Sequence, residues 1–201
     1  MVTDNIQSNE IYQEDRFSSL EIEGQVIQQA EFYGCRFKGC TLQEMTFAGC
    51  TFEDCQFQDC KLSMLKIPAS RFLDCRFSDC ELVGVNWTEA SLSKSVLKAP
   101  FSFERCSLNH STFIAMRLNG LLMKDCAARD VDLSEADLSR ADLRGTDFAE
   151  SRFANTILDG ADLRGAKRYD INPGLNSLKG ARFDLPEALS LLYNLDIVLD
   201  E

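Results

Sequence analysis

The stretch FKGCTLQEMTFAGCTFEDCQFQDCKL, residues 37–62, decides the fold of this 201-residue chain. Every fifth residue in it is Phe or Leu, from Phe37 to Leu62. Five residues turn a side chain by about 500° on an α-helix, and an odd step alternates between the faces of a flat strand, so neither element would bury these side chains together. The period instead fits a chain that turns a corner every five residues and points one large side chain inward from each side of a square coil.

The same period extends far beyond this stretch. From Phe17 to Leu97 all 17 positions at this spacing are apolar. The frame slips by one residue within 98–102 and then runs from Phe103 to Leu163, with Ala128 as the small exception. Four sides make a coil of about twenty residues, and coils stack through backbone hydrogen bonds roughly 4.8 Å apart. The sequence therefore predicts an all-β solenoid, a right-handed quadrilateral β-helix.

All nine cysteines occupy a second inward position, two residues before a central side chain. This position must be small because it shares the interior with Phe or Leu, and Cys is a small, readily buried hydrophobe. Gaps of four residues would place neighbouring cysteines on different walls of the coil, which does not suit a zinc site with its closing ligand pair. Core packing is therefore the favoured interpretation, and a metal site or disulfides are the alternatives.

The chain divides into four regions. We expect an N-terminal arm over residues 1–14, the repeat solenoid over 15–165, an irregular turn with a last repeat over 166–184, and a C-terminal cap over 185–201. The leucine spacing of the cap predicts a helix, with Asp184 as its N-cap and Pro186 in its first turn, followed by a short strand.

The last coil of a solenoid must be covered, and a leucine-rich helix can cover it and still present apolar surface. We therefore expect the cap to form a twofold homodimer. Its interface would contain Leu185, Leu189, Leu192, Leu195, Ile197, Val198 and Leu199.

Charge and motifs exclude several functions. The formal net charge is −11, which should repel nucleic acid and acidic membranes and favour basic partners, although solubility is the plainer explanation. No apolar run could span a membrane and no secretory leader is present, so we expect a cytoplasmic protein. Phosphate-binding, dinucleotide and metalloprotease motifs are missing, and no partner is placed beside His110, the only histidine. We expect no enzymatic activity, no cofactor and no metal.

Several stretches of the sequence resemble a known protein family. ADLSRADLRGTDF (136–148) and GADLRGA (160–166) match the pentapeptide-repeat consensus. A repeat rod that ends in a turn-rich insert and ARFDLPEALSLL (181–192) resembles the gyrase-protecting branch, which includes Qnr proteins and the immunity proteins against albicidin and microcin B17. LVGVNWTEAS (82–91) and SFERCSLN (102–109) look especially like the albicidin-resistance type.

The resemblance implies a dimeric DNA mimic that binds DNA gyrase, not nucleic acid, and relieves a gyrase poison. The acidic surface facing gyrase would comprise Asp54, Asp59, Asp74, Asp79, Asp132, Asp137, Asp142, Asp147 and Asp162. A plainer reading of these aspartates is that they suit the turns. Loop contacts would come from Ser91, Leu92, Ser93, Lys94, Ser95, Val96, Leu97 and Pro100.

The longer loops of Qnr proteins are missing here, so protection against a peptide-like toxin fits better than protection against fluoroquinolones. The alternative function is a structural or regulatory scaffold that binds another basic partner. The sequence does not indicate which compound would be countered.

Overall fold

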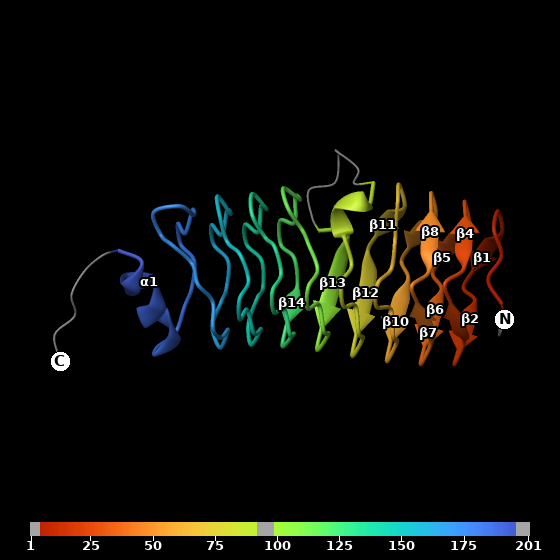
Figure 1. Ribbon diagram of the computed structural model, residues 1–201, viewed down its shortest axis with the longest axis horizontal. Helices are drawn as coiled ribbons and strands as arrows, with labels where there is room; N and C mark the ends of the chain where they lie inside the picture. The colour runs from red at the N-terminus through yellow and green to blue at the C-terminus, as the bar shows by residue number, and fades with distance from the viewer. Residues whose placement is uncertain (1–4, 92–98, 196–201) are drawn as a thin grey trace.

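The chain winds into a long rod with its two ends at opposite tips (Figure 1). The computed structural model describes residues 5–91 and 99–195. Successive coils run around the rod axis and pair in parallel with the coils before and after them. The predicted fold, a right-handed quadrilateral β-helix, is confirmed.

Four parallel sheets form the four faces of the rod. Face 1 contains β1 (Ile11–Gln13), β5 (Glu31–Tyr33), β9 (Thr51–Glu53) and β11 (Arg71–Leu73). Face 2 contains β2 (Arg16–Ser18), β6 (Arg36–Lys38), β10 (Gln56–Gln58), β12 (Cys75–Ser78), β13 (Phe101–Glu104) and β14 (Met123–Lys124). Face 3 contains β3 (Glu21–Glu23) and β7 (Thr41–Gln43), and face 4 contains β4 (Val26–Gln28) and β8 (Thr46–Ala48). Isolated parallel bridges, such as Asp142 to Asp162, extend the faces toward the C-terminus.

The core is a set of stacked side chains, one column behind each face. On face 2, Phe37 stacks on Phe17 and Phe57 with ring centroids 4.5 Å apart in both cases, and Phe57 stacks on Phe77 at 4.7 Å. Burial of these apolar side chains and the contacts between stacked rings both stabilise the rod. The five-residue spacing of Phe and Leu therefore indicated the core correctly.

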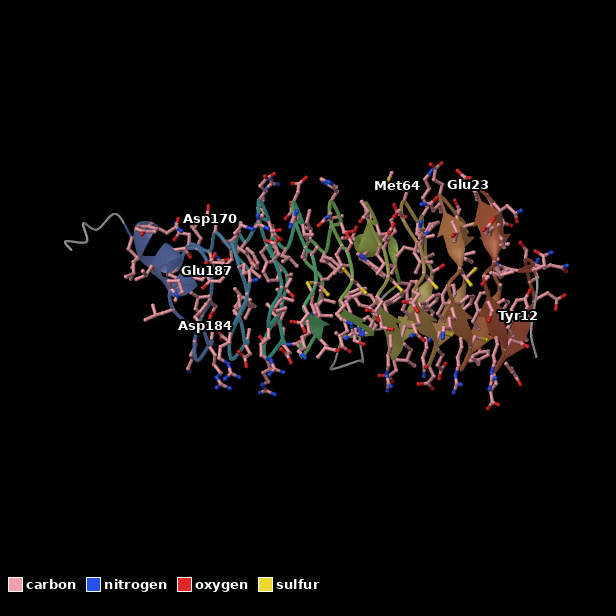
Figure 2. All side chains as sticks on the ribbon, turned by 90° about the horizontal axis from the view of Figure 1, so that it is seen from below. Tyr12, Glu23, Met64, Asp170, Asp184 and Glu187 are labelled. Carbon is pink, nitrogen blue, oxygen red and sulfur yellow. The ribbon has the colours of Figure 1, made fainter. Side chains whose placement is uncertain are left out.

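The cysteines fill the narrow inward position beside these columns. All nine are free thiols and all are buried, and Figure 2 shows sulfur atoms between the walls of the rod. The thiol of Cys55, for example, donates to the carbonyl oxygen of Phe32 in the preceding coil at 3.3 Å. Their predicted role in core packing is confirmed by this burial.

The solenoid begins earlier than predicted. β1 pairs with β5, and the Tyr12 ring stacks on Phe32 at 5.0 Å. The N–H of Asn9 also donates to Gln28 at 2.8 Å. The expected N-terminal arm over residues 1–14 is therefore wrong for residues 9–14, because Tyr12 fills a central position that Phe or Leu fills elsewhere.

The frame slip is larger than predicted. Phe57 pairs with Phe77, twenty residues further on, whereas Phe77 pairs with Phe103, twenty-six residues further on. The coil therefore contains six additional residues, not one. Residues 92–98, which include most of the predicted loop contacts, lie outside the described part of the chain.

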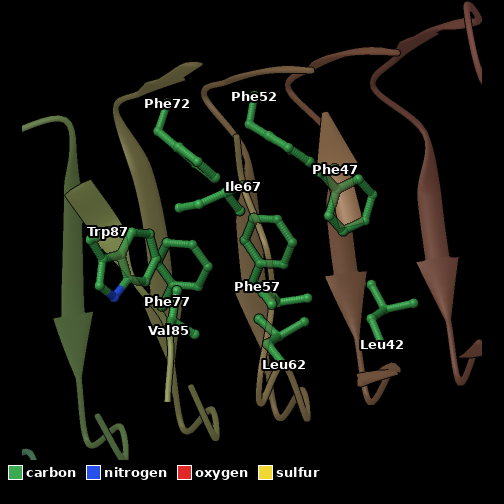
Figure 3. A pocket seen from close by; sticks show the side chains of 11 residues that line it. Leu42, Phe47, Phe52, Phe57, Leu62, Ile67, Phe72, Phe77, Val85 and Trp87 are labelled. Atoms are coloured by element: carbon green, nitrogen blue, oxygen red, sulfur yellow. The ribbon is translucent and has the colours of Figure 1, made fainter. Parts of the chain in front are cut away.

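Trp87 fills a central position on face 4, just before this insertion. It is buried and begins a 3-10 turn, η1 (Trp87–Glu89). Asn86 caps this turn, because its Oδ1 accepts a hydrogen bond from the N–H of Thr88 at 3.1 Å. An apolar cavity of about 20 Å³ lies beside the indole. Figure 3 shows the side chains that line it, among them Phe57, Phe77 and Trp87. The large indole is thus accommodated by a local change of backbone and by slightly imperfect packing.

The helix of the C-terminal cap is shorter than predicted. Within the residues that the structure describes, it consists of a 3-10 turn, η2 (Glu187–Leu189), followed directly by α1 (Ser190–Tyr193). Leu191 packs against the last part of the core. Asp184 does not cap this helix, since its Oδ2 accepts from the N–H of Gly165 at 2.9 Å. The predicted strand Ile197–Leu199 lies outside the described residues.

Candidate interaction surfaces

The four aspartates predicted in the N-terminal half lie at corners of the coils. Asp54, Asp59, Asp74 and Asp79 all have positive φ, between 49° and 55°. Asp tolerates this left-handed conformation better than most residues, so the corner itself favours its presence. All four are exposed. The Asp79 carboxylate pairs with Arg105 at 2.7 Å, and this hydrogen bond lowers the pKa of Asp79.

The five aspartates predicted in the C-terminal half share a different position, one residue before a central side chain. Each accepts a hydrogen bond from the backbone N–H two residues further on, as in Ser134 N–H to Asp132 at 2.9 Å and Ser139 N–H to Asp137 at 3.0 Å. The same contact is made by Asp142, Asp147 and Asp162. This Asx turn shapes the corner, so these aspartates have a structural role whether or not they meet a partner.

Arginines neutralise four of these five carboxylates. Asp132 pairs with Arg152 at 3.0 Å, and Asp142 pairs with Arg144 at 2.6 Å. The other two carboxylates each pair with two arginines: Asp147 with Arg129 and Arg168, and Asp162 with Arg164 and Arg182. Asp137 instead accepts from the Asn119 amide at 2.9 Å. The acidic surface predicted for this half is therefore largely a set of internal ion pairs.

The ion pairs change the acidity of these groups. The hydrogen bond from Arg164 lowers the pKa of Asp162 to about 2, although partial burial acts in the opposite direction. A carboxyl group whose pKa is lower in the folded state stabilises the fold above its unfolded pKa of about 3.9, and the stabilisation is lost as the pH falls toward 2.

Replacing Asp162 with asparagine should therefore lower stability most at neutral pH. We expect the difference in urea midpoint between wild type and Asp162→Asn to shrink as the pH falls from about 6 to about 2, because protonation removes the same charge from the wild type. Glu135→Gln, which removes an exposed carboxyl group, is the control and should leave the midpoint at pH 6 nearly unchanged. A constant difference for Asp162→Asn across this range would contradict the assignment.

Carboxylates outside the predicted acidic surface also lie on faces 1 and 3. Glu21 and Glu23 are exposed on β3, and Glu53, which is half-buried, points outward from β9. Within residues 5–91 and 99–195, none of these three takes part in an ion pair. Their signal in the sequence was their place next to a central, inward-pointing residue, which is where a repeat directs side chains outward.

Two of the predicted loop residues can be placed. Ser91 is exposed, and its N–H donates to Ser70 O at 2.8 Å. Pro100 is buried, and its carbonyl oxygen accepts from Cys75 N–H at 3.1 Å. The prediction that Pro100 makes a loop contact with a partner is therefore wrong, because its ring lies in the wall of the coil.

The C-terminal cap presents apolar side chains to solvent. Leu185 is 75% exposed, Leu189 40%, Tyr193 71% and Leu195 46%. Leu192 is partly buried. Of the predicted interface residues, Ile197, Val198 and Leu199 lie beyond the described part of the chain, and Tyr193 is an exposed aromatic residue that the prediction missed. Asp170, Asp184 and Glu187 lie near this cap (Figure 2).

The described residues contain no group of three or more His, Cys, Asp and Glu side chains placed to hold a metal ion. His110 pairs with Asp130 at 2.9 Å on the exposed surface. Within the same residues, no helix is long and apolar enough to cross a membrane.

Two protein-family models match this sequence. A pentapeptide repeat region matches residues 30–100, and pentapeptide repeats in eight copies match residues 129–167. Together the two matches cover more than half of the chain. The chain is a pentapeptide-repeat protein. By sequence alone, no curated protein gives a significant match.

Solved pentapeptide-repeat structures share the fold over most of this chain. A trypsin-treated form of QnrB1, described as a plasmid-mediated fluoroquinolone resistance protein, matches with a TM-score of 0.57 and 20% identity over 96% of this chain and 98% of that chain. Full-length QnrB1 matches with a TM-score of 0.55 and 21% identity over 93% and 99%. HetL of the cyanobacterium Nostoc sp. strain PCC 7120, involved in heterocyst differentiation regulation, matches with a TM-score of 0.57 and 15% identity over 88% and 87%.

Proposed function

We propose that this protein is a non-enzymatic, homodimeric partner of DNA gyrase in the cytoplasm, and that it protects gyrase from a peptide-like poison. The observation that supports this most is the correspondence with QnrB1, a resistance protein by its description, over nearly the full length of both chains. In the proposed dimer, the exposed leucines at the C-terminal end of the rod would join two protomers.

The distribution of unpaired charges indicates which part of the rod would contact gyrase. A basic protein surface is attracted by carboxylates that are not already neutralised. In the C-terminal half most predicted aspartates are paired with arginine. The proposed contact therefore moves to carboxylates of the N-terminal half, namely Glu21 and Glu23 on face 3, the half-buried Glu53 on face 1, and the exposed corner residues Asp54 and Asp59.

A second candidate is a regulatory scaffold without any role at gyrase. The match to HetL, whose description is that of a regulatory protein, supports this alternative with the same TM-score as the match to QnrB1. A scaffold would use the same rigid rod but would not change the activity of a topoisomerase.

A supercoiling assay separates the two functions. Gyrase is incubated with relaxed plasmid and a peptide-type poison such as microcin B17, with and without the purified protein. We expect the protein to restore supercoiling, and we expect a smaller effect against a fluoroquinolone. The variant E21Q/E23Q/E53Q should lose most of this protection, because it removes three unpaired charges that would meet the basic partner.

The matched control is D132N/D142N/D162N, which removes the same number of charges from carboxylates that are already paired. At the assay temperature it should retain protection as long as circular dichroism shows a folded protein. If the wild type neither alters supercoiling nor rescues gyrase from any poison, the gyrase proposal is wrong and the scaffold is favoured.

A further inference from the structure

One face of the rod has a charge opposite to that of the whole molecule. The outward side chains of β2, β6, β10 and β12 form a basic strip, which we define as Arg16, Ser18, Arg36, Lys38, Gln56, Gln58, Arg76 and Ser78. The strip contains four basic residues and no acidic residue, although the chain as a whole has a formal charge of −11. Net charge alone conceals this segregation, because the solenoid distributes neighbouring residues of the sequence over different faces.

The basic residues of the strip are not neutralised by the protein itself. Within the described residues, Arg16, Arg36, Lys38 and Arg76 take part in no ion pair, and all four are exposed. Arg16 lies directly opposite Arg36 in the ladder. Like charges in facing positions of neighbouring strands destabilise a sheet, and a bound anion would relieve this repulsion.

The strip is hollowed on its surface. A groove of about 380 Å³ is lined by Arg16, Arg36, Lys38 and the two glutamines, with Ser18 at one side. A second groove of about 350 Å³ at the corner shares Arg16, Arg36 and Gln56. Glu14 and Asp54, at corners of the coils, also line this second groove, so negative charges lie beside Arg16 and Arg36 at this side of the strip.

The side chains of the strip are those that contact nucleic-acid phosphates. Arg, Lys, Ser and Gln make the sequence-independent contacts to phosphate and sugar oxygens. A protein partner would be expected to bury apolar or aromatic side chains at the centre of its interface, and the strip exposes none, since the adjoining Phe37 is only 1% exposed. Single strands are usually held by base stacking on exposed aromatic rings, which the strip also does not offer.

We propose that the basic strip binds the phosphate backbone of duplex DNA, without sequence preference. This reverses the expectation, drawn from net charge, that the protein does not contact nucleic acid. The inference is independent of gyrase, because the strip and its test require only this chain and DNA.

The number of basic residues in the strip determines how strongly we expect it to bind DNA and how this affinity depends on salt. Contacts to about three or four phosphates give a slope of log K against log salt of roughly −2.7 to −3.6, so the affinity should fall roughly 40- to 150-fold between about 50 and 200 mM salt. At about 50 mM salt we expect a dissociation constant between about 1 and 100 µM, which is typical of weak, non-specific binding.

The test is fluorescence anisotropy of a labelled random-sequence duplex of about 20 base pairs, titrated with the full-length protein. The variant R16Q/R36Q/R76Q should weaken binding by about tenfold or more. The matched control K61Q/K66Q/R71Q removes the same charge from exposed residues at the same position of the repeat on the other three faces, and should weaken binding less than about threefold. Circular dichroism confirms that both variants are folded.

Three results would overturn the inference. Failure of the wild type to bind the duplex at low salt would exclude it directly. An equal loss in both variants would show that overall charge, and not the strip, determines binding. Tighter binding of a glutamate-rich peptide of equal charge, or of a single strand, would assign the strip to a different class of partner.

Discussion

Replacing Phe57 with alanine is expected to lower the free energy of unfolding by about 3–5 kcal/mol. Phe57 is 5% exposed and lies in the middle of a column, stacked on Phe37 at 4.5 Å and on Phe77 at 4.7 Å. The substitution removes both ring contacts and enlarges the cavity that already exists beside Trp87 (Figure 3). A solenoid has no second layer that could move in to fill the space, so little of the loss is recovered by relaxation.

Urea denaturation, followed by both Trp87 fluorescence and circular dichroism, measures this loss. Gln58→Ala on the same strand is the control, since Gln58 is exposed and its replacement should change the free energy of unfolding by less than about 0.5 kcal/mol. A loss below about 1 kcal/mol for Phe57→Ala would contradict the view that the aromatic columns hold the coils together.

Introducing a charge into the C-terminal cap is expected to separate the protomers. Leu189 lies in η2 with its side chain 40% exposed, close in sequence to the exposed Leu185 and Tyr193. If this surface is buried in a dimer, Leu189→Asp places a carboxylate in an apolar contact and should weaken association by at least about 2 kcal/mol, roughly thirtyfold in dissociation constant. Light scattering over a range of protein concentrations would show a monomer where the wild type shows a dimer.

The chain offers a close control for this experiment. Ile114 is 42% exposed, nearly the same as Leu189, but lies midway along the rod on face 4. Ile114→Asp should leave the dimer intact. If Leu189→Asp and wild type have the same mass, or if Ile114→Asp also dissociates, the proposed cap interface is wrong.

The fold could be predicted from sequence because its rule is local. Each five-residue segment makes one side of a coil, so the period of Phe37 to Leu62 specifies the inward side chains without any knowledge of distant contacts. The burial of the cysteines follows from the same rule. Tyr12 obeys the period too, and it was missed only because a tyrosine replaces the usual Phe or Leu and no regular repeat precedes it.

The insertion near residue 98 shows where this rule stops. A five-residue period reveals the length of an insertion only up to whole repeats, so six extra residues look the same as one. Pairing between coils, which the sequence does not record, distinguishes the two. The helix before residue 196 was overestimated for a related reason, because leucine spacing predicts which residues share a helical face but not where the helix begins and ends.

The charged surface was the least predictable feature. A sequence shows which residues are acidic, but pairing depends on residues that approach from neighbouring coils, as Arg152 does beside Asp132 twenty positions earlier. Ion pairs within one turn are equally hard to predict from sequence, since Arg144 meets Asp142 only when the turn brings the two side chains together. Both the neutralised aspartates and the basic strip depend on which residues share a face of the rod.

The alignment of the coils has a consequence for how such a rod tolerates changes in length. Because four sides complete one circuit, removing five residues anywhere would rotate everything beyond the cut by a quarter turn about the long axis. The carboxylates of one half would then come into line with a different side of the other half. Removing twenty would shorten the rod by one step and leave every side in line.

The twenty-six-residue coil preserves this alignment, because Phe103 still lies over Phe77. Natural variation in length should therefore favour whole circuits, or excursions that return to the same side.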